Sequence, residues 1–162
     1  MAQRKNTRRN EKQPEDVIAM LKADHKKVQA LFDKFESAGE GQTKVKQQIA
    51  EEVFMELEIH TRLEEEIFYP AFDAAADTEG EKLIAESIEE HQVVKTLMEE
   101  MRELDPSDER YEAKFTVLME NVRHHIEEEE EEMFPEAEDI LEDEMDELME
   151  QMQELKQELM AS

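Results

Sequence analysis

Apolar residues and histidines recur at spacings of three and four residues in four successive segments of the chain. Such spacing places them along one side of an α-helix, as in helices that pack at a shallow angle. The segments run for roughly 24 to 34 residues, far longer than β-strands. The sequence therefore predicts an all-α fold, an up-down-up-down four-helix bundle with an additional C-terminal helix. The inward positions are Ile18, Leu21, His25, Val28, Phe32 and Phe35; Ile49, Val53, Leu57, His60, Glu64 and Ile67; Ile84, His91, Val94, Met98 and Met101; and Phe115, Leu118, Val122, His125 and Glu129.

Glycine, proline and aspartate mark the connections between these segments. Turns are expected at residues 39–42, 77–80 and 105–108. Pro70 and Pro135 fall inside or at the end of two predicted helices. We expect them to bend or end those helices, because proline lacks an N–H and its ring clashes with the preceding turn. Short connections make neighbouring helices antiparallel.

The bundle is flanked by two segments of different composition. Residues 1–13 carry five basic residues and one acidic residue without an apolar core, which predicts a basic disordered tail. The bundle is expected over residues 14–137, followed by an acidic amphipathic helix over residues 138–162. Two interpretations of this helix remain open: it packs on the bundle, or it forms a coiled-coil homodimer through residues 141–159. Its apolar seam consists of Leu141, Met145, Leu148, Met152, Leu155 and Leu159.

Acidic residues dominate the composition and limit the partners of the chain. There are 46 Asp and Glu against 19 Lys and Arg, so the formal net charge is −27. This charge repels phosphate backbones and anionic membranes, so neither nucleic acid nor a membrane is expected as a partner. The absence of cysteine excludes disulfides, thiolate metal sites and a cysteine nucleophile. We expect a soluble, cytoplasmic protein.

Four of the five histidines lie on the inward seams, one in each predicted helix. Counted from the turns at a rise of about 1.5 Å per residue, all four fall at the same level of the bundle, within about one turn. Side chains on four inward seams at one level converge on one point. Nothing in core packing requires four histidines, so they indicate a shared site. They are His25, His60, His91 and His125.

Two of these histidines are followed by a glutamate four residues later, on the same face of the helix. The pairs are His60 with Glu64 and His125 with Glu129, and each is followed by a proline ten residues after the histidine. The paired motifs repeat after 65 residues, and the single histidines repeat after 66. The pattern indicates two copies of one helical hairpin, each supplying two histidines and one glutamate.

Four imidazoles and two carboxylates form a mixed nitrogen and oxygen ligand set that suits iron, manganese or zinc. Six ligands are too many for one tetrahedral zinc, but they fit two metals, each with two histidines, bridged by the two glutamates. Burying such a cluster without a cation is costly, so the site predicts its own metal. The ferritin-like Glu-x-x-His motif is absent, because no residue three positions before a histidine is acidic.

His124 lies off the seam and is expected at the surface or beside the ligands. Most other glutamates near the motifs are expected on a solvated face; they are Glu65, Glu66, Glu127, Glu128 and Glu130 to Glu132.

The order His, His-x3-Glu, His, His-x3-Glu, with Tyr-Pro and Phe-Pro after the paired motifs, resembles the bacterial hemerythrin-like (HHE cation-binding) domain over roughly residues 15–137. The resemblance implies a four-helix bundle around two iron ions, bridged by an oxo or hydroxo group, with manganese or zinc as less favoured metals. Members of the family are linked to oxygen binding, oxygen or redox sensing, iron or nitric oxide responses, and peroxide chemistry. Carried over residue by residue, the ligands are His25, His60, Glu64, His91, His125 and Glu129.

The chain departs from the oxygen-carrying hemerythrins in two places. They have two histidines four residues apart on the third helix, whereas here Ser87 and Lys95 stand four residues from His91. Their last carboxylate is an aspartate five residues after its histidine, where this chain has Glu130, although the internal repeat favours Glu129. Four histidines imply a more symmetric centre than that of a reversible carrier. Peroxide-linked chemistry or sensing is therefore expected at least as much as oxygen carriage.

Two functional hypotheses follow from the sequence, ahead of a third alternative, a bare acidic helical bundle without a metal. The first is a non-haem di-iron protein that binds or senses dioxygen or reacts with peroxide, with nitric oxide as another possible small ligand. The second is a non-enzymatic, acidic helical interaction protein with a structural metal site and a C-terminal coiled-coil seam. No catalytic residue is singled out beyond the metal ligands.

Overall fold

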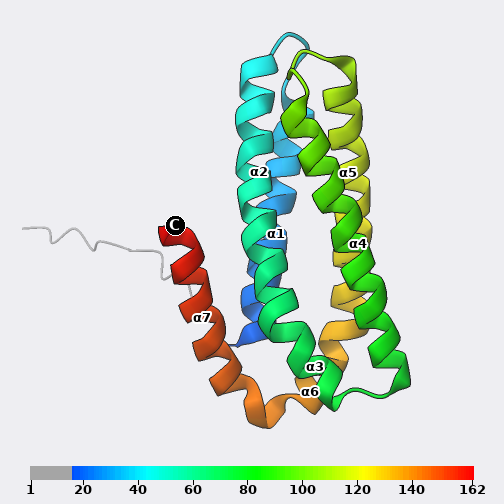
Figure 1. The fold of residues 1–162 in the computed structure, drawn as a ribbon, viewed down its shortest axis with the longest axis vertical. Helices are drawn as coiled ribbons and strands as arrows, with labels where there is room; N and C mark the ends of the chain where they lie inside the picture. The colour runs from blue at the N-terminus through cyan, green and yellow to red at the C-terminus, as the bar shows by residue number, and fades with distance from the viewer. Residues whose placement is uncertain (1–15) are drawn as a thin grey trace, which may run out of the picture.

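A computed structural model describes residues 16–162, and the predicted basic tail at residues 1–13 lies outside this range. Within the described residues, four long helices run side by side in an up-down-up-down bundle, and a further helix lies against one side of it (Figure 1). The predicted all-α bundle with an additional C-terminal helix is confirmed. The bundle helices are α1 (Val17–Ser37), α2 (Thr43–Leu63), α4 (Thr78–Glu103) and α5 (Glu109–Glu128), and the C-terminal helix is α7 (Met145–Ala161).

Three aspartates fix where bundle helices begin. The side chains of Asp16, Asp77 and Asp108 accept hydrogen bonds from backbone N–H groups in the first turns of α1, α4 and α5. These N–H groups have no partner within the helix, so each cap stabilises its helix start. The turn predicted at residues 77–80 is shorter than expected, because α4 already begins at the residue after its cap. In the α1–α2 turn, Gly41 has a φ of 82°, a left-handed conformation that favours glycine.

The two prolines do not end their helices. In both halves of the chain a π-helical segment precedes the proline, and an α-helix continues through it. The backbone N–H just before each proline donates to a carbonyl five residues earlier, which widens the turn that would otherwise clash with the proline ring. Both π-helical segments begin at a predicted glutamate ligand. The segments are η1 (Glu64–Phe68) and α3 (Tyr69–Ala75) after α2, and η2 (Glu129–Met133) and α6 (Phe134–Ile140) after α5.

Buried apolar side chains form two clusters along the bundle. One fills the end that carries the α1–α2 turn and includes Phe32 and Phe115. The other fills the end that carries α3 and α6 and includes Phe68 and Phe72. In each bundle helix the inward histidine lies between residues of the two clusters. The histidine layer is therefore shielded from water by apolar packing on both sides.

The C-terminal helix α7 packs against α1 and α2 along the half of the bundle that contains the second cluster (Figure 1). A single 3-10 turn, η3 (Glu142–Glu144), connects it to α6. Leu148 and Met152 are buried against the bundle, and Leu155 is half-buried. The structure thus places the apolar seam against the bundle, the first of the two interpretations. A homodimer through residues 141–159 stays a prediction.

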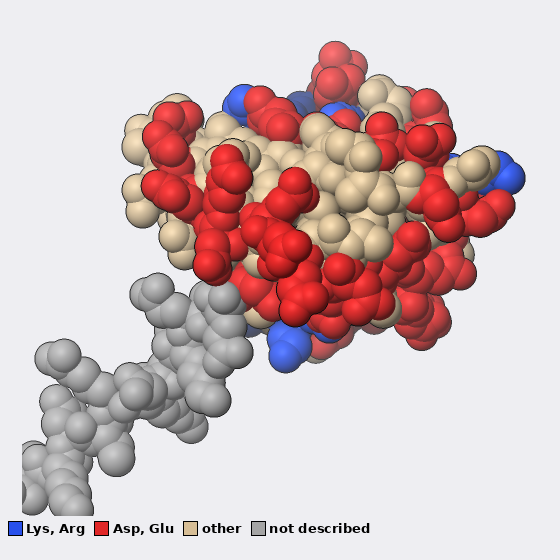
Figure 2. All heavy atoms as spheres, turned by 90° about the horizontal axis from the view of Figure 1, so that it is seen from below, with Lys and Arg blue, Asp and Glu red and all other residues tan. Residues whose placement is uncertain are grey.

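Acidic side chains cover much of the molecular end that carries α3, α6 and the start of α7 (Figure 2). Of the glutamates expected on a solvated face, Glu66, Glu127, Glu131 and Glu132 are exposed, and Glu128 is partly exposed. Glu65 and Glu130 are only partly exposed, because both turn toward the histidine layer. Among the described residues, no helix has the length and apolar character needed to cross a membrane.

Candidate metal centre

The six residues singled out in the sequence meet at one buried point between the bundle helices. The two glutamates stand at the first positions of η1 and η2, immediately after the helices that carry His60 and His125. Every one of the six side chains belongs to a residue that is less than a tenth exposed. The structure thus brings together all of the predicted ligands: His25, His60, Glu64, His91, His125 and Glu129.

The histidines of each hairpin form one half of the centre. His25 and His60 lie with their ring centroids 4.9 Å apart, and His91 and His125 lie 4.8 Å apart. In all four rings Nε2 faces the glutamate oxygens. The Nε2 atoms of His91 and His125 are 3.2 Å from each other. Two pairs of imidazole nitrogens therefore face a shared carboxylate layer.

Each glutamate contacts both halves of the centre. Glu64 Oε1 lies 3.0 Å from Nε2 of His60 on its own hairpin and 3.3 Å from Nε2 of His91 on the other. Glu129 lies 3.1 Å from Nε2 of His125 through Oε2 and 3.2 Å from Nε2 of His25 through Oε1. Both carboxylates therefore lie between the two histidine pairs, in a cluster of side chains that could hold metal ions.

A second layer of carboxylates faces the outer ring nitrogens of the histidines. The distances to Nδ1 are 3.0 Å from Asp24 to His60, 3.5 Å from Glu90 to His125, and 3.6 Å each from Glu65 to His91 and from Glu130 to His25. Such partners hold an imidazole in one orientation and strengthen it as a ligand. Sequence reasoning missed all four. The internal repeat contained the signal, since Asp24 and Glu90 each precede a ligand histidine, and Glu65 and Glu130 each follow a ligand glutamate.

Tyr69 adds a phenol to one half of the centre. Its buried hydroxyl donates a 2.6 Å hydrogen bond to Oε2 of Glu129 and lies 3.3 Å from Nε2 of His91. The equivalent residue of the second repeat is Phe134, whose ring stacks on His25 at a centroid distance of 5.6 Å. Burial and the Glu129 carboxylate raise the pKa of Tyr69 well above its usual value, so the hydroxyl keeps its proton. The two halves are therefore chemically different.

The carboxylates shift the pKa values of the buried histidines. Burial alone would lower the pKa of His60, but the charges and hydrogen bonds of Glu64 and Asp24 outweigh it and raise the pKa to about 10. Burial is likewise outweighed at His125, where hydrogen bonding to Glu129 contributes most to raising the pKa to about 11. Burial would raise the pKa of Glu64, but the histidines hold it well below its usual value. The neighbouring carboxylates thus favour the protonated forms of His60 and His125 in the metal-free centre.

The family model of the hemerythrin HHE cation-binding domain matches residues 16–137, which include all six predicted ligands. The chain belongs to the hemerythrin family. The crystal structure of a hemerythrin HHE cation-binding domain-containing protein from Mycobacterium kansasii is similar, with a TM-score of 0.74 and 27% sequence identity. That likeness covers 89% of this chain and 86% of the mycobacterial one.

Two curated relatives are longer than this hemerythrin. An uncharacterized hemerythrin-like protein of Schizosaccharomyces pombe is 29% identical over 112 residues, which cover 69% of this chain and 54% of that protein. A DNA nickase of Nostoc sp. is 26% identical over 131 residues, which cover 79% of this chain and 35% of the nickase. The chain therefore spans about half the length of the yeast relative and about a third of the Nostoc relative.

The residues of this hemerythrin domain fit a pair of bound cations. Several buried atoms lack a hydrogen bond of acceptable geometry despite their short contacts, among them both ring nitrogens of His25, Nε2 of His60, both carboxylate oxygens of Glu64 and Oε1 of Glu129. Such atoms are costly to bury unless something else satisfies them. Imidazole and carboxylate are ligands for iron, manganese and zinc, so metal ions at this position would satisfy the set.

An apolar cavity of about 30 Å³ adjoins the four ligand histidines on the side of the α1–α2 turn. Val28, Leu57, Val94 and Val122 contribute to its lining, and polar atoms are nearly absent from its surface. A volume of this size holds one small molecule but no larger organic substrate. The cavity therefore leaves space for a small molecule beside the four histidines.

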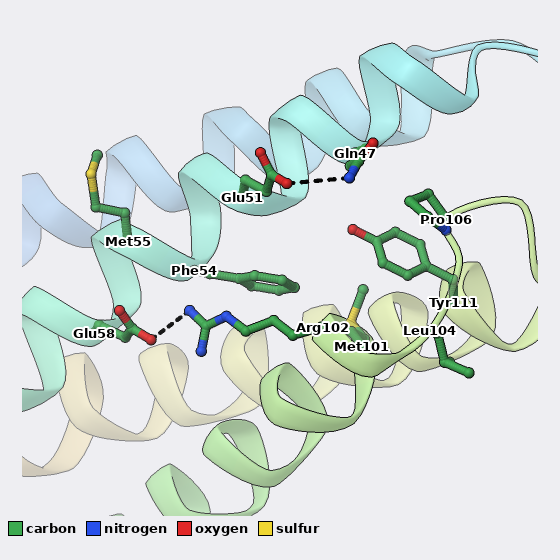
Figure 3. A pocket seen from close by; sticks show the side chains of 10 residues that line it. All are labelled: Gln47, Glu51, Phe54, Met55, Glu58, Met101, Arg102, Leu104, Pro106 and Tyr111. Atoms are coloured by element: carbon green, nitrogen blue, oxygen red, sulfur yellow. Dashed lines mark hydrogen bonds and ion pairs between the residues drawn. The ribbon is translucent and has the colours of Figure 1, made fainter.

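The remaining histidine and a pocket at one end of the bundle lie apart from this centre. His124 is exposed and faces Glu128 at 3.5 Å, in agreement with its expected surface position. A pocket of about 330 Å³ lies between α2 and the α4–α5 connection, lined by residues that include Phe54 and Tyr111 (Figure 3). An ion pair between Arg102 and Glu58 crosses its edge. No predicted ligand lines this pocket.

The raised pKa values predict that alkaline pH destabilises the metal-free protein. The pKa values of His60 and His125 in the folded chain, about 10 and about 11, exceed the value of 6.5 expected on unfolding. Their contribution to stability is therefore fully present below about pH 6.5 and is lost as the pH rises toward 10 and 11. Each kcal/mol lost lowers the Tm of a chain of this size by about 2–4 °C. We expect the Tm of chelator-treated protein, followed by circular dichroism, to fall between pH 6.5 and 9.5.

The two single variants H60A and H125A serve as controls for this dependence of the Tm on pH. Each lacks one of the shifted groups, so its Tm should depend less steeply on pH than that of the wild type. A wild-type Tm that stays constant or rises over this interval would contradict the assignment.

Proposed function

We propose that this hemerythrin domain holds two iron ions and binds or senses dioxygen, or reacts with peroxide, with nitric oxide as a further small ligand. One observation supports the proposal above all others. Four imidazole Nε2 atoms and two carboxylates surround one buried point, and each carboxylate contacts histidines of both hairpins. The imidazole and carboxylate ligands also suit manganese and zinc, and the resemblance to hemerythrin-like domains is the reason for proposing iron.

The chain's own residues prepare this centre in three ways. The histidines and glutamates are fixed by the outer carboxylates before a metal arrives. The apolar clusters on both sides keep water out. The Tyr69 hydroxyl, which keeps its proton, is placed to donate a hydrogen bond or a proton in the His91 half. Iron, when bound, would supply Lewis acidity and electrons.

The apolar cavity supports a small ligand over a larger substrate. It adjoins the histidines directly, so a molecule within it would lie beside the metal-binding layer. Its lining offers few hydrogen-bonding atoms, which suits an apolar diatomic molecule better than a charged metabolite. We do not propose that this chain nicks DNA as the Nostoc relative is named for doing, because its net charge of −27 repels DNA phosphates.

A second candidate is an interaction protein in which the metal is structural. The observation in its favour is the far end of α7, where Leu159 is half-buried and Met160 is two-thirds exposed. These side chains extend the seam proposed for a homodimer through residues 141–159. In this alternative the centre would stabilise the bundle without reacting with a small ligand.

Metal analysis and optical spectroscopy test the leading proposal. Protein produced in iron-rich medium is expected to contain about two iron ions per chain and to show ligand-to-metal charge-transfer bands when oxidised. Added azide or peroxide should change these bands if the centre has an accessible position. Fewer than about one metal ion per chain would contradict the proposal. Two ions with a spectrum that neither azide nor peroxide alters would favour the structural alternative.

A further inference from the structure

The C-terminal helix α7 reaches the candidate metal centre through a single lysine. Lys156 Nζ lies 3.1 Å from Oδ1 of Asp24, and Oδ2 of the same carboxylate lies 3.0 Å from Nδ1 of His60. We propose that Lys156 is a positioning residue of the centre, which fixes Asp24 and thereby the orientation of His60. The inference rests on the proposed metal-binding function, but it adds to the centre a residue, Lys156, that lies beyond the family-matched segment, which ends at residue 137.

The geometry of this chain of contacts favours a specific role over a chance surface pair. Asp24 is buried, with 8% of its surface exposed, and uses its two oxygens for the two different partners. A buried carboxylate must be satisfied on both oxygens to remain charged. One oxygen of Asp24 therefore receives the Lys156 ammonium group, and the other is placed to accept a hydrogen bond from the Nδ1–H of His60.

The internal repeat supplies a comparison within the same molecule. The equivalent of Asp24 is Glu90, which faces Nδ1 of His125 at the longer distance of 3.5 Å. Among residues 16–162, no lysine or arginine forms an ion pair with Glu90, and no helix equivalent to α7 covers that side. The support of His60 is thus tighter than that of its counterpart, and the difference coincides with the presence of Lys156.

The packing of α7 explains how one lysine can hold this position. Leu148 and Met152 are buried against the bundle within two turns before Lys156, so the helix is fixed before it reaches the centre. The lysine stem crosses the partly buried edge of the bundle, and its ammonium group ends on Asp24. A displacement of α7 would therefore remove the cation that holds the outer partner of His60. It would weaken one half of the centre and leave the other intact.

Cobalt titration of the full-length, metal-free chain tests the proposal. Removal of an outer partner of a ligand histidine typically lowers metal affinity 10- to 100-fold. We expect K156M to weaken the binding of one of two Co²⁺ ions by about tenfold and to leave the other within about twofold of wild type. K156R keeps a positive charge at this position, so its Co²⁺ affinity should lie within about threefold of that of the wild type. K82M removes a lysine from an exposed ion pair on α4 and serves as the charge-matched control.

A double-variant comparison and a spectroscopic measurement separate positioning from general stability. D24N should show the same selective loss, and the double variant D24N/K156M should be no weaker than D24N alone, because both changes break one chain of contacts. In ¹⁵N-histidine NMR spectra of the metal-free protein, the Nδ1–H signal of His60 should be lost or exchange faster in K156M, with K156R like wild type. This measurement needs no bound metal.

The outcomes distinguish this inference from the proposed function. If wild type binds two ions and K156M binds both with unchanged affinity, the metal centre stands and the role of Lys156 is refuted. Equal weakening of both ions, or full additivity with D24N, would also refute it, because a general loss of stability would then explain the effect. If wild type binds no cobalt, the metal-binding function and this inference fail together.

Discussion

Replacing Glu64 by glutamine is expected to remove metal binding from both halves of the centre at once. Glu64 contacts His60 in one half and His91 in the other, so its carboxylate would be one of the two ligands shared between them. Loss of an outer partner alone lowers affinity 10- to 100-fold, so loss of a bridging ligand should lower it by more than about 100-fold for each ion. Metal content after desalting measures the effect directly.

The same variant should lose the stability that bound metal provides. At a free metal concentration of about 1,000 times the Kd, binding stabilises the folded state by about 4 kcal/mol. In a protein of this size that corresponds to a Tm about 10 °C higher, which E64Q should not show on addition of metal. E66Q is the matched control, because Glu66 lies on the exposed face in an ion pair with Arg62. H60A should lose one ion only; if E64Q also lost only one, Glu64 would not bridge.

The periodicity of the sequence was sufficient to predict the fold. In α1, all six positions of the predicted seam are buried, from Ile18 to Phe35, because a spacing of three and four leaves one helix face for the core. The prolines were less predictable. The hydrophobic pattern does not tell whether a helix ends at a proline or widens before it, and here a π-helical segment precedes both Pro70 and Pro135.

The inner ligands of the site were predictable because they are rare or repeated. Histidine occurs five times in the chain, so one in each helix at one level is informative. Glutamate is abundant, and only the repeated spacing distinguished Glu64 and Glu129 from their neighbours. The outer carboxylates, such as Glu65 and Glu90, also lie at repeated positions beside the ligands, but the repeat does not tell which way their side chains face. Their position depends on the angle between helices, which periodicity does not define.

Lys156 illustrates the same limit over a longer range. The heptad seam predicted that one face of α7 is apolar, but not which surface it would cover. Its contact with Asp24 joins residues 132 positions apart and depends on the course of the chain through α6 and η3. Sequence patterns within a helix carry no such information, so this contact emerged only from the three-dimensional arrangement.

The two repeats differ in that Tyr69 stands where the second repeat has Phe134, and replacing Tyr69 is expected to have a large effect on the reaction with peroxide. Y69F should leave the metal content unchanged, because the hydroxyl donates to Glu129 and replaces none of the six ligands. The rate of reaction with peroxide should fall by about 100-fold, the usual contribution of a positioned proton donor. Stopped-flow spectroscopy of the iron-loaded protein, at several peroxide concentrations, measures this rate separately from metal content.

The chain offers a matched control, because its only other tyrosine lies far from the centre. Tyr111 lines the pocket between α2 and the α4–α5 connection, and Y111F removes a phenol hydroxyl there. Y111F should react with peroxide like wild type. If Y69F reacted as fast as Y111F, the phenol would have no part in the chemistry. If Y69F instead lost metal, the hydroxyl would be holding the ligand set together, and the asymmetry between Tyr69 and Phe134 would concern metal retention rather than proton transfer.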